Sequence, residues 1–441
     1  MNSPLSLARR MARDAGRVTW NTLPAEVVGK VKTGLLDFLS CAYDARELPW
    51  SCQAIQIASR ASGPVPVIGT PVRSAATEAA FANATLGHGL VREDMHTGAV
   101  SHLGVVLFPT LLALAAERKV SGGEFLTAAV CGYEIGASVG RALMDQEMVS
   151  RFRPTGITGP IGGAAAGSRL LGFDEDRMVR ALGLAANMTG GLNEWPFCGG
   201  DEMFFHPGFA ARSAVTAVEL AELGACASET ALDGRAGLFA GLNRADRVSA
   251  VAPFHGAFEI LSVYYKPAPA CNYAQTACQA ALAVACEIQG APISAVSVKV
   301  STAAKNYPGC DCAGPFERIL QAKMSIQYCV AATLTRGAIE EANYHRLTDP
   351  QITRLAGMIT LESDPAFTAA YPKTQGAEVS VTLADGRRVT RRLDDVTPAT
   401  PSEIRQRFCS AAGRAAAPIE EAIDRLEKLD DLSSLTALLS T

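Results

Sequence analysis

The sequence lacks the features that mark proteins bound to nucleic acids or embedded in membranes. No run of five or more Lys or Arg residues occurs, and the formal net charge at pH 7 is -4 over 441 residues. Nucleic acids are bound through clusters of positive charge, so we expect neither a nucleic acid nor an anionic membrane as a partner. The longest apolar run, Leu103 to Ala116, contains Pro109 and is shorter than the roughly 20 residues that cross a bilayer. We therefore predict no transmembrane segment.

Signals for export and for nucleotide binding are also missing. Residues 1–10 contain no continuous apolar stretch followed by small residues, which favours a cytoplasmic location. No GxGxxG motif follows a predicted strand, which argues against a hydride-transfer enzyme. No Gly-Lys-Ser or Gly-Lys-Thr follows the glycine-rich segment at 156–163, so that segment is not a Walker loop.

The twelve cysteines lie at irregular spacing, mostly within apolar patterns. Cysteines of this kind behave as small hydrophobic residues, so we expect reduced thiols rather than disulfides. The one close pair, Cys310 and Cys312, has neither a second pair nor a nearby histidine to complete a tetrahedral site. We therefore predict no metal site.

Two patterns divide the chain, which is long enough for two hydrophobic cores. From Leu23 to about Tyr265, alanine and leucine recur at spacings of three and four, as in packed helices. After Lys266, helical patterns are mixed with segments that alternate with period two, and helical periodicity resumes after Pro401. We predict a mainly α fold, with a large helical domain of residues 1–266, completed by 397–441, and a smaller α+β domain of residues 267–396.

The expected elements follow from these patterns. We predict helices over 25–42, 73–88, 109–118, 122–144, 162–171, 175–187, 209–223, 273–289 and 322–338. We predict strands over 296–301, 358–362, 377–383 and 387–393, with a hairpin turn at Ala384-Asp385-Gly386. Asp174 is expected to cap one helix, and Ser121 with Glu124 to form a capping box at another.

The segment from Arg92 to Gly104 concentrates ionisable groups in a stretch without helical periodicity. His96 and His102 can act as general acid or base near neutral pH, and Asp94 can orient a histidine or bind a substrate hydroxyl. Loops held by a rigid scaffold often carry such chemistry. The alternative is a capped structural loop with surface acids and one hydrogen-bonded histidine, and the residues alone leave both interpretations open.

Two further segments could bind an anion. In the glycine-rich stretch from Arg151 to Gly163, the hydroxyls of Thr155 and Thr158 and free N–H groups at a helix start suit a carboxylate or phosphate, with Arg153 adding a bidentate contact. The alternative is that these glycines serve tight packing.

In the second segment, Lys266 lies between aromatic residues and a Pro-x-Pro sequence at the predicted domain junction. It could neutralise a substrate carboxylate or the enolate formed from it. The alternative is an exposed lysine on a linker. Weaker candidates are Tyr328, on a helix, and His206, which could simply cap the helix expected from Phe209.

Together these motifs resemble the MmgE/PrpD family, whose members include 2-methylcitrate dehydratase, cis-aconitate decarboxylase and iminodisuccinate epimerase. The resemblance covers almost the whole chain and rests on the order of loose motifs. These are Gly87-His88-Gly89-Leu90, Glu93-Asp94-Met95-His96, Ser101-His102-Leu103-Gly104, Gly132-Tyr133-Glu134, Arg153-Pro154-Thr155-Gly156, His206-Pro207-Gly208, Lys266-Pro267-Ala268-Pro269, Ser325-Ile326-Gln327-Tyr328 and Ala384-Asp385-Gly386-Arg387.

The resemblance implies a large helical domain with a smaller α+β lid domain, a homodimer, no cofactor, and an active site between the domains. It places the catalytic residues at Asp94, His102, Lys266 and Tyr328. The chain departs from the family pattern at three positions: Arg153 and Gln275 stand where many members carry histidine, and Met203 stands where many carry lysine. These changes redistribute the positive charge available to a carboxylate substrate.

We therefore expect a lyase that takes a proton from a carbon next to a carboxylate in a small di- or tricarboxylate, with His102 as base and Lys266 as cationic stabiliser. A dehydratase needs an acid for the leaving hydroxyl, whereas an epimerase needs a second base. Since His96, Asp94 and Tyr328 could each be the second group, an epimerase, isomerase or decarboxylase remains the runner-up. A third hypothesis is an inactive carboxylate-binding homologue.

Overall fold

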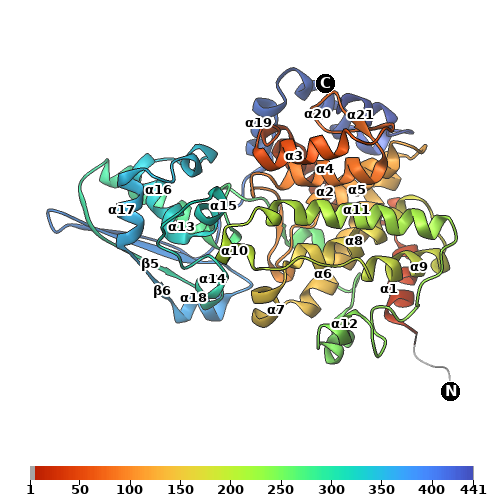
Figure 1. Ribbon diagram of the computed structural model, residues 1–441, viewed down its shortest axis with the longest axis horizontal. Helices are drawn as coiled ribbons and strands as arrows, with labels where there is room; N and C mark the ends of the chain where they lie inside the picture. Colours follow the sequence, from red (N-terminus) through yellow and green to blue (C-terminus); the bar gives the residue numbers. More distant parts are fainter. Residues whose placement is uncertain (1–4, 441) are drawn as a thin grey trace.

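The computed structural model describes residues 5–440, and it confirms a mainly α fold (Figure 1). Residues 1–4 lie outside the described residues. They belong to the segment 1–10 on which the prediction of a cytoplasmic location rests. No helix in the described chain is long and apolar enough to cross a bilayer. The helices are α1 (Leu7–Arg17), α2 (Ala25–Asp44), α3 (Pro49–Ala58), α4 (Ala76–His88), α5 (Gly104–Ala115), α6 (Gly122–Leu143), α7 (Gln146–Arg151), α8 (Pro154–Leu170), α9 (Glu175–Ala186), α10 (Trp195–Cys198), α11 (Glu202–Glu222), α12 (Leu238–Gly241), α13 (Gln275–Ile288), α14 (Thr302–Asn306), α15 (Ile319–Met324), α16 (Ile326–Arg336), α17 (Pro350–Met358), α18 (Pro365–Ala370), α19 (Pro401–Ala412), α20 (Ala416–Asp424) and α21 (Ser433–Leu438).

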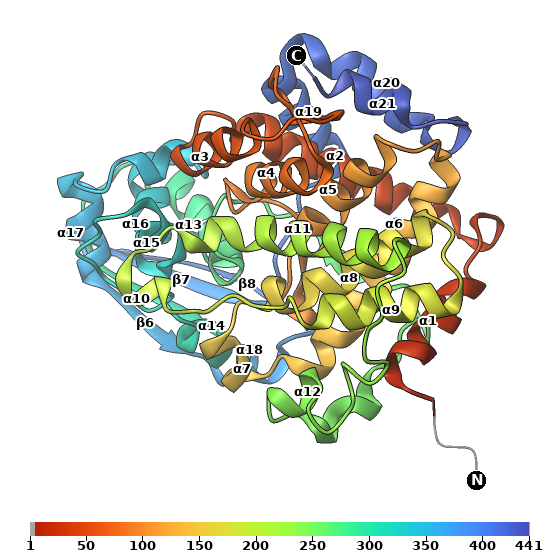
Figure 2. The ribbon, with the colours of Figure 1, turned by 45° about the vertical axis from the view of Figure 1, so that its right-hand side comes forward.

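The helical part is built around α5 and α8, two helices that are buried almost along their whole length. Helix α5 packs against α4 and α8, and α8 packs against α6, α9 and α11. Glycine and alanine dominate these contacts and let the backbones approach closely. Near the chain's end, α19 packs on α2, so the last helices lie on the helical part (Figures 1 and 2).

The α+β part contains a four-stranded sheet in the order β6-β5-β7-β8. Strand β5 (Ile293–Val300) runs parallel to β6 (Ile359–Ser363) and antiparallel to β7 (Ala377–Leu383), which forms a hairpin with β8 (Arg388–Leu393). Val296, Val298 and Val300 are buried in alternation with more exposed neighbours, which is the period-two pattern of a sheet with one covered face. Helix α13 packs on β7 and β8, and α16 packs on α13 and β6. The four predicted strands and the hairpin are confirmed.

Two short strand pairs and one break in a helix differ from the sequence-based expectation. The helical part contains the two-residue pairs β1 (Val65–Pro66) with β2 (Arg73–Ser74) and β3 (Met95–His96) with β4 (Val263–Tyr264). The helix predicted over 322–338 is broken into α15 and α16 at Ser325, whose hydroxyl caps α16 by accepting from the Tyr328 N–H. Helix α1 was not predicted.

Three helices begin earlier than predicted. Helix α5 starts at Gly104 rather than at Pro109. Helix α8 starts at Pro154 rather than near Gly162, because proline suits a first helical turn and Thr158 bonds back to the Pro154 carbonyl. Helix α11 starts at Glu202 rather than near Phe209, so His206 lies inside the helix and does not cap it. The predicted caps at Asp174 and at Ser121 with Glu124 are confirmed. The exact boundaries of the two predicted domains stay a prediction.

Gly163 tests the close helix packing. A Cβ atom on this residue of α8 would come 2.5 Å from the Cβ atom of Ala214 in α11. We expect Gly163→Ala to lower the free energy of unfolding by about 1–3 kcal/mol, the usual cost of overpacking. Gly29→Ala is the matched control on an exposed helix surface, where no atom lies within 4 Å of the added Cβ, and alanine there should add about 0.5–1 kcal/mol. Urea unfolding measures both, and an unchanged Gly163→Ala stability would contradict the packing.

Candidate active site

A small cavity lies where the 91–102 segment, the start of α8 and the α+β part meet. Its volume is about 20 Å³, room for about one water molecule. Its walls carry both polar and apolar groups: Val91, Met95, Val100, His102, Arg153, Met203, Cys271, Asn272, Tyr273, Tyr307 and Met324. The cavity thus brings together residues from three of the segments that the sequence singled out, with little free space between them.

His102 is held with one ring nitrogen fixed and the other unengaged by the described residues. Its Nδ1 lies 2.8 Å from the Asp94 carbonyl oxygen and 3.0 Å from Oε1 of Glu93. Both partners are acceptors, so Nδ1 carries the hydrogen and Nε2 keeps its lone pair. Burial lowers the pKa of His102 well below its usual value, so the ring is neutral at neutral pH. A neutral imidazole with a free Nε2 can accept a proton.

Glu93 and His88 belong to the same cluster, although the sequence analysis proposed neither as a site residue. Glu93 is fully buried and contacts Nδ1 of His88 as well as Nδ1 of His102. Burial would raise the Glu93 pKa, but His88, His102 and Lys266 lower it far below the usual range. Glu93 is therefore an anion between two histidines. The signals in the sequence were the Gly87-His88-Gly89 motif and the acid next to Asp94.

Two cations border this cluster. Arg153 lines the cavity, with Nη2 3.3 Å from Nε2 of His88 and Nη1 3.4 Å from the Tyr307 hydroxyl. Lys266 is completely buried and donates to the Val91 carbonyl. Burial lowers the pKa of Lys266 to about 8, against the opposing charge of Glu93. Within residues 5–440, neither cation has a carboxylate oxygen within 4.0 Å, so both keep the capacity to bind one.

Three of the predicted binding residues surround the cavity without lining it. Thr155 Oγ1 accepts from the His102 N–H at 3.0 Å and so positions the histidine backbone. Thr158 Oγ1 lies 3.0 Å from Ser101 Oγ and donates to the Pro154 carbonyl. His206 is buried, and Nδ1 has no hydrogen-bond partner among the described residues. Burial, together with Arg153 and His88, lowers the pKa of His206 to about 3.

Asp94 and Tyr328 do not reach the cavity. The Asp94 carboxylate accepts the Gly104 N–H at 3.2 Å and the Tyr133 hydroxyl at 2.7 Å, which places it at the start of α5. Only its backbone carbonyl faces His102. The Tyr328 hydroxyl donates to the Asn343 carbonyl at 3.0 Å, inside the α+β part. Both side chains therefore bond to protein groups away from the cavity, and neither makes the catalytic contact that the resemblance implies.

His96 also points away from the cavity. Its Nδ1 accepts the Ala99 N–H and its Nε2 lies 3.0 Å from Oε2 of Glu259, both in the protein interior. Both ring nitrogens are thus occupied by protein groups, which leaves none for the substrate contact expected of His96.

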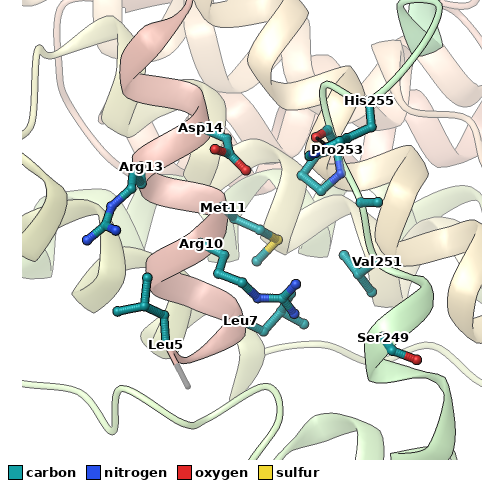
Figure 3. A pocket seen from close by; sticks show the side chains of 11 residues that line it. Leu5, Leu7, Arg10, Met11, Arg13, Asp14, Ser249, Val251, Pro253 and His255 are labelled. Atoms are coloured by element: carbon teal, nitrogen blue, oxygen red, sulfur yellow. Dashed lines mark hydrogen bonds between the residues drawn. The ribbon is translucent and has the colours of Figure 1, made fainter. Parts of the chain in front are cut away.

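A larger pocket lies elsewhere, between α1 and residues 249–255 (Figure 3). Its volume is about 370 Å³. Arg10 and Asp14 lie on the α1 side and His255 on the other, while His102, Arg153 and Lys266 are absent from its walls. Cavity size and cavity chemistry therefore point to different places. Proton transfer needs a base and nearby cations, and these lie at the smaller cavity.

Comparison with known proteins places the chain in a family. Residues 9–250 match the MmgE/PrpD N-terminal domain, and residues 268–425 match the MmgE/PrpD C-terminal domain. The chain belongs to the MmgE/PrpD family, as the motifs indicated.

Its relatives in this family are enzymes. The chain is 34% identical to the cis-aconitate decarboxylase-like protein oryM of Aspergillus oryzae over 46% of its length and 44% of that protein. It is 25% identical to a cis-aconitate decarboxylase of Aspergillus terreus over 100% of its length and 97% of that protein. It is 28% identical to 2-methylcitrate dehydratase of Cupriavidus necator over 51% of its length and 49% of that protein.

Asp94 gives a pH-dependent test of these contacts. Burial raises its pKa to about 7, with Glu93 adding to the rise and the Tyr133 and Gly104 hydrogen bonds opposing it. Between about pH 4 and pH 7 the folded state therefore holds a proton that the unfolded state releases. In this range the free energy of unfolding falls as pH rises, by about 1.4 kcal/mol per pH unit.

Asp94→Asn removes this titration but still offers an oxygen to the Gly104 N–H. We expect the stability of the variant relative to the unchanged protein to improve between pH 5 and pH 7 in urea unfolding and to change little above pH 7, where Asp94 is ionised in both states. The same stability difference at both pH values would contradict the assignment.

Proposed function

We propose that the protein is a lyase that takes a proton from a carbon next to a carboxylate of a small di- or tricarboxylate. The observation that carries the proposal is a neutral His102, with Nε2 unengaged, at a cavity that Arg153 also lines. Lys266 does not line the cavity, but it is buried behind Val91 and its charge acts on both His102 and Glu93. Membership of the MmgE/PrpD family supports it, because the named relatives act on cis-aconitate or 2-methylcitrate.

In this proposal Nε2 of His102 accepts the proton. The positive charge that develops on the ring is stabilised by Glu93 and by the Asp94 carbonyl, both of which contact Nδ1. The negative charge that develops on the substrate spreads onto its carboxylate, where Lys266 and Arg153 are the available cations. Electrostatic stabilisation of this kind is strongest in a closed site from which water is excluded.

Substrate entry requires the site to open. The cavity volume of about 20 Å³ is far below the roughly 300 Å³ or more typical of small-molecule pockets. Its walls come from the helical part, through His102 and Arg153, and from the α+β part, through Tyr307 and Met324. We propose that these two parts separate to admit the carboxylate and close over it.

Dehydration and decarboxylation are the two candidate outcomes. Dehydration like that of 2-methylcitrate dehydratase needs an acid that protonates the leaving hydroxyl. Decarboxylation instead breaks a carbon–carbon bond and returns a proton to carbon. Two relatives that align over at least 99% of the chain are named cis-aconitate decarboxylases, which supports decarboxylation as the second candidate. Release of carbon dioxide from a tricarboxylate, or of water from a hydroxy acid, separates the two in one assay panel.

His102→Ala tests the base directly. We expect the unchanged protein to exchange a carbon-bound proton of at least one di- or tricarboxylate for deuterium in deuterated water, and the variant to lose about 10²- to 10⁴-fold in exchange rate, the usual contribution of a general base. Proton NMR of the substrate measures this. His255→Ala, on an exposed loop, is the control and should exchange normally. A His102→Ala variant that exchanges at the original rate would exclude His102 as the base.

Lys266 predicts the alkaline limb of the pH profile. Its pKa of about 8 lies below the usual lysine value, so the side chain is charged below that pH and loses its charge as pH rises through it. We expect kcat/KM to fall above about pH 8. Lys266→Arg should move this limb upward, because the guanidinium stays charged, and Lys266→Ala should lower kcat about 10²- to 10³-fold. If the alkaline limb of Lys266→Arg lies at the same pH as that of the unchanged protein, the titration of Lys266 does not set this limb.

A further inference from the structure

His96 is a buried histidine whose two ring nitrogens are both engaged. Nδ1 accepts the Ala99 N–H at 3.0 Å, so the ring hydrogen lies on Nε2 and is donated to Oε2 of Glu259 at 3.0 Å. Glu259 is itself fixed by α6: its N–H donates to Glu134 at 2.6 Å, and its other oxygen accepts from Arg141 at 2.5 Å. His96 is therefore bonded to a rigid anchor outside the cavity.

This bond joins the two segments that carry the proposed base and the proposed cation. His96 lies in β3, and β3 pairs with β4, with Met95 opposite Tyr264 and His96 opposite Val263. A second bridge joins His96 to Ser101, so the loop closes directly before His102. On the other side, β4 ends two residues before Lys266.

The strand pair is too short to hold these segments alone. Each strand has two residues, and even an isolated hairpin of ordinary length is only marginally stable. The side-chain bond from His96 to Glu259 adds a buried hydrogen bond that does not depend on the strand pairing.

We infer that His96 and Glu259 form a positioning pair that fixes His102 relative to Lys266, an inference that rests on the proposed function. Neither residue lines the cavity. The pair acts by keeping the base and the cation at a constant separation across the substrate. A displacement of about 1 Å at a reacting centre can cost about 10²-fold in rate, so loss of the pair should lower turnover while the fold persists.

Two substitutions separate positioning from simple loop capping. The Gln side chain in His96→Gln is long enough to donate from its amide to Glu259 but lacks the Nδ1 acceptor for Ala99. The Asn side chain in His96→Asn can accept the Ala99 N–H but is too short for Glu259. Positioning predicts that His96→Gln keeps kcat within about fivefold, whereas His96→Asn loses about 10- to 100-fold in kcat with a smaller change in KM. The reverse order would show that His96 only caps the loop and would overturn the inference.

Hydrogen exchange followed by mass spectrometry gives a readout that needs no substrate. In His96→Asn we expect faster amide exchange in both 95–104 and 259–266, with unchanged exchange in the α5 and α8 cores. His96→Gln should show neither change, nor should the control His255→Gln on the exposed loop. Faster exchange in 95–104 alone would overturn the positioning pair. If the unchanged protein turns over no carboxylate, the proposed function fails, and the exchange pattern still decides whether the two segments are coupled.

Discussion

The structure of the site depends on the burial of one carboxylate, that of Glu93. A buried ion costs several kcal/mol unless hydrogen bonds and opposite charge compensate it. Here His88 comes from the end of α4, His102 from the loop before α5, and the positive charge of Lys266 from the segment after β4. Losing any one of these segments would remove part of what compensates Glu93, whose Oε2 already has no hydrogen-bond partner among the described residues. The same requirement that makes the cluster costly therefore makes its geometry specific.

The backbone before Glu93 ties the helical and α+β parts together. Lys266 donates to the Val91 carbonyl, and Lys323 of α15 donates to the Leu90 carbonyl at 2.8 Å and to Glu341 at 2.6 Å. Val91 has a positive φ of 57°, a conformation that is costly for a β-branched residue. Two buried ammonium groups on consecutive carbonyls supply hydrogen bonds that offset this cost. In the proposed reaction the same contacts close the site, and Lys266 can exchange the Val91 carbonyl for a substrate carboxylate.

The sequence predicted those parts of the structure that depend on local periodicity and on few side chains. The helices α2, α6 and α9 and the four strands follow from patterns within single segments. That His102 and Lys266 belong to one site was implied only by the family resemblance, because no pattern within one segment shows which segments the fold brings together. The different roles of Glu93 and Asp94 could not be predicted from the sequence, because they are adjacent acids. Only the fold directs the Glu93 carboxylate toward His102 and the Asp94 carboxylate toward Tyr133. Helix starts at Pro154 and Glu202 were missed for a related reason, since glycine and proline favour loops unless neighbouring helices bury them.

The three departures from the family pattern illustrate how the same position can acquire a different physical role. Gln275 is fully buried and accepts from the Ala268 N–H while donating to the carbonyls of Ala268, Ala270 and Cys271. It therefore braces the turn that follows Lys266 and adds no charge. Met203 places a neutral sulfur 2.8 Å from Nε2 of His88, and Arg153 approaches the same nitrogen at 3.3 Å. The positive charge beside His88 therefore comes from Arg153, next to the start of α8. In the proposed site, the substrate carboxylates would then meet one cation from the residue that precedes α8 and one from the segment after β4.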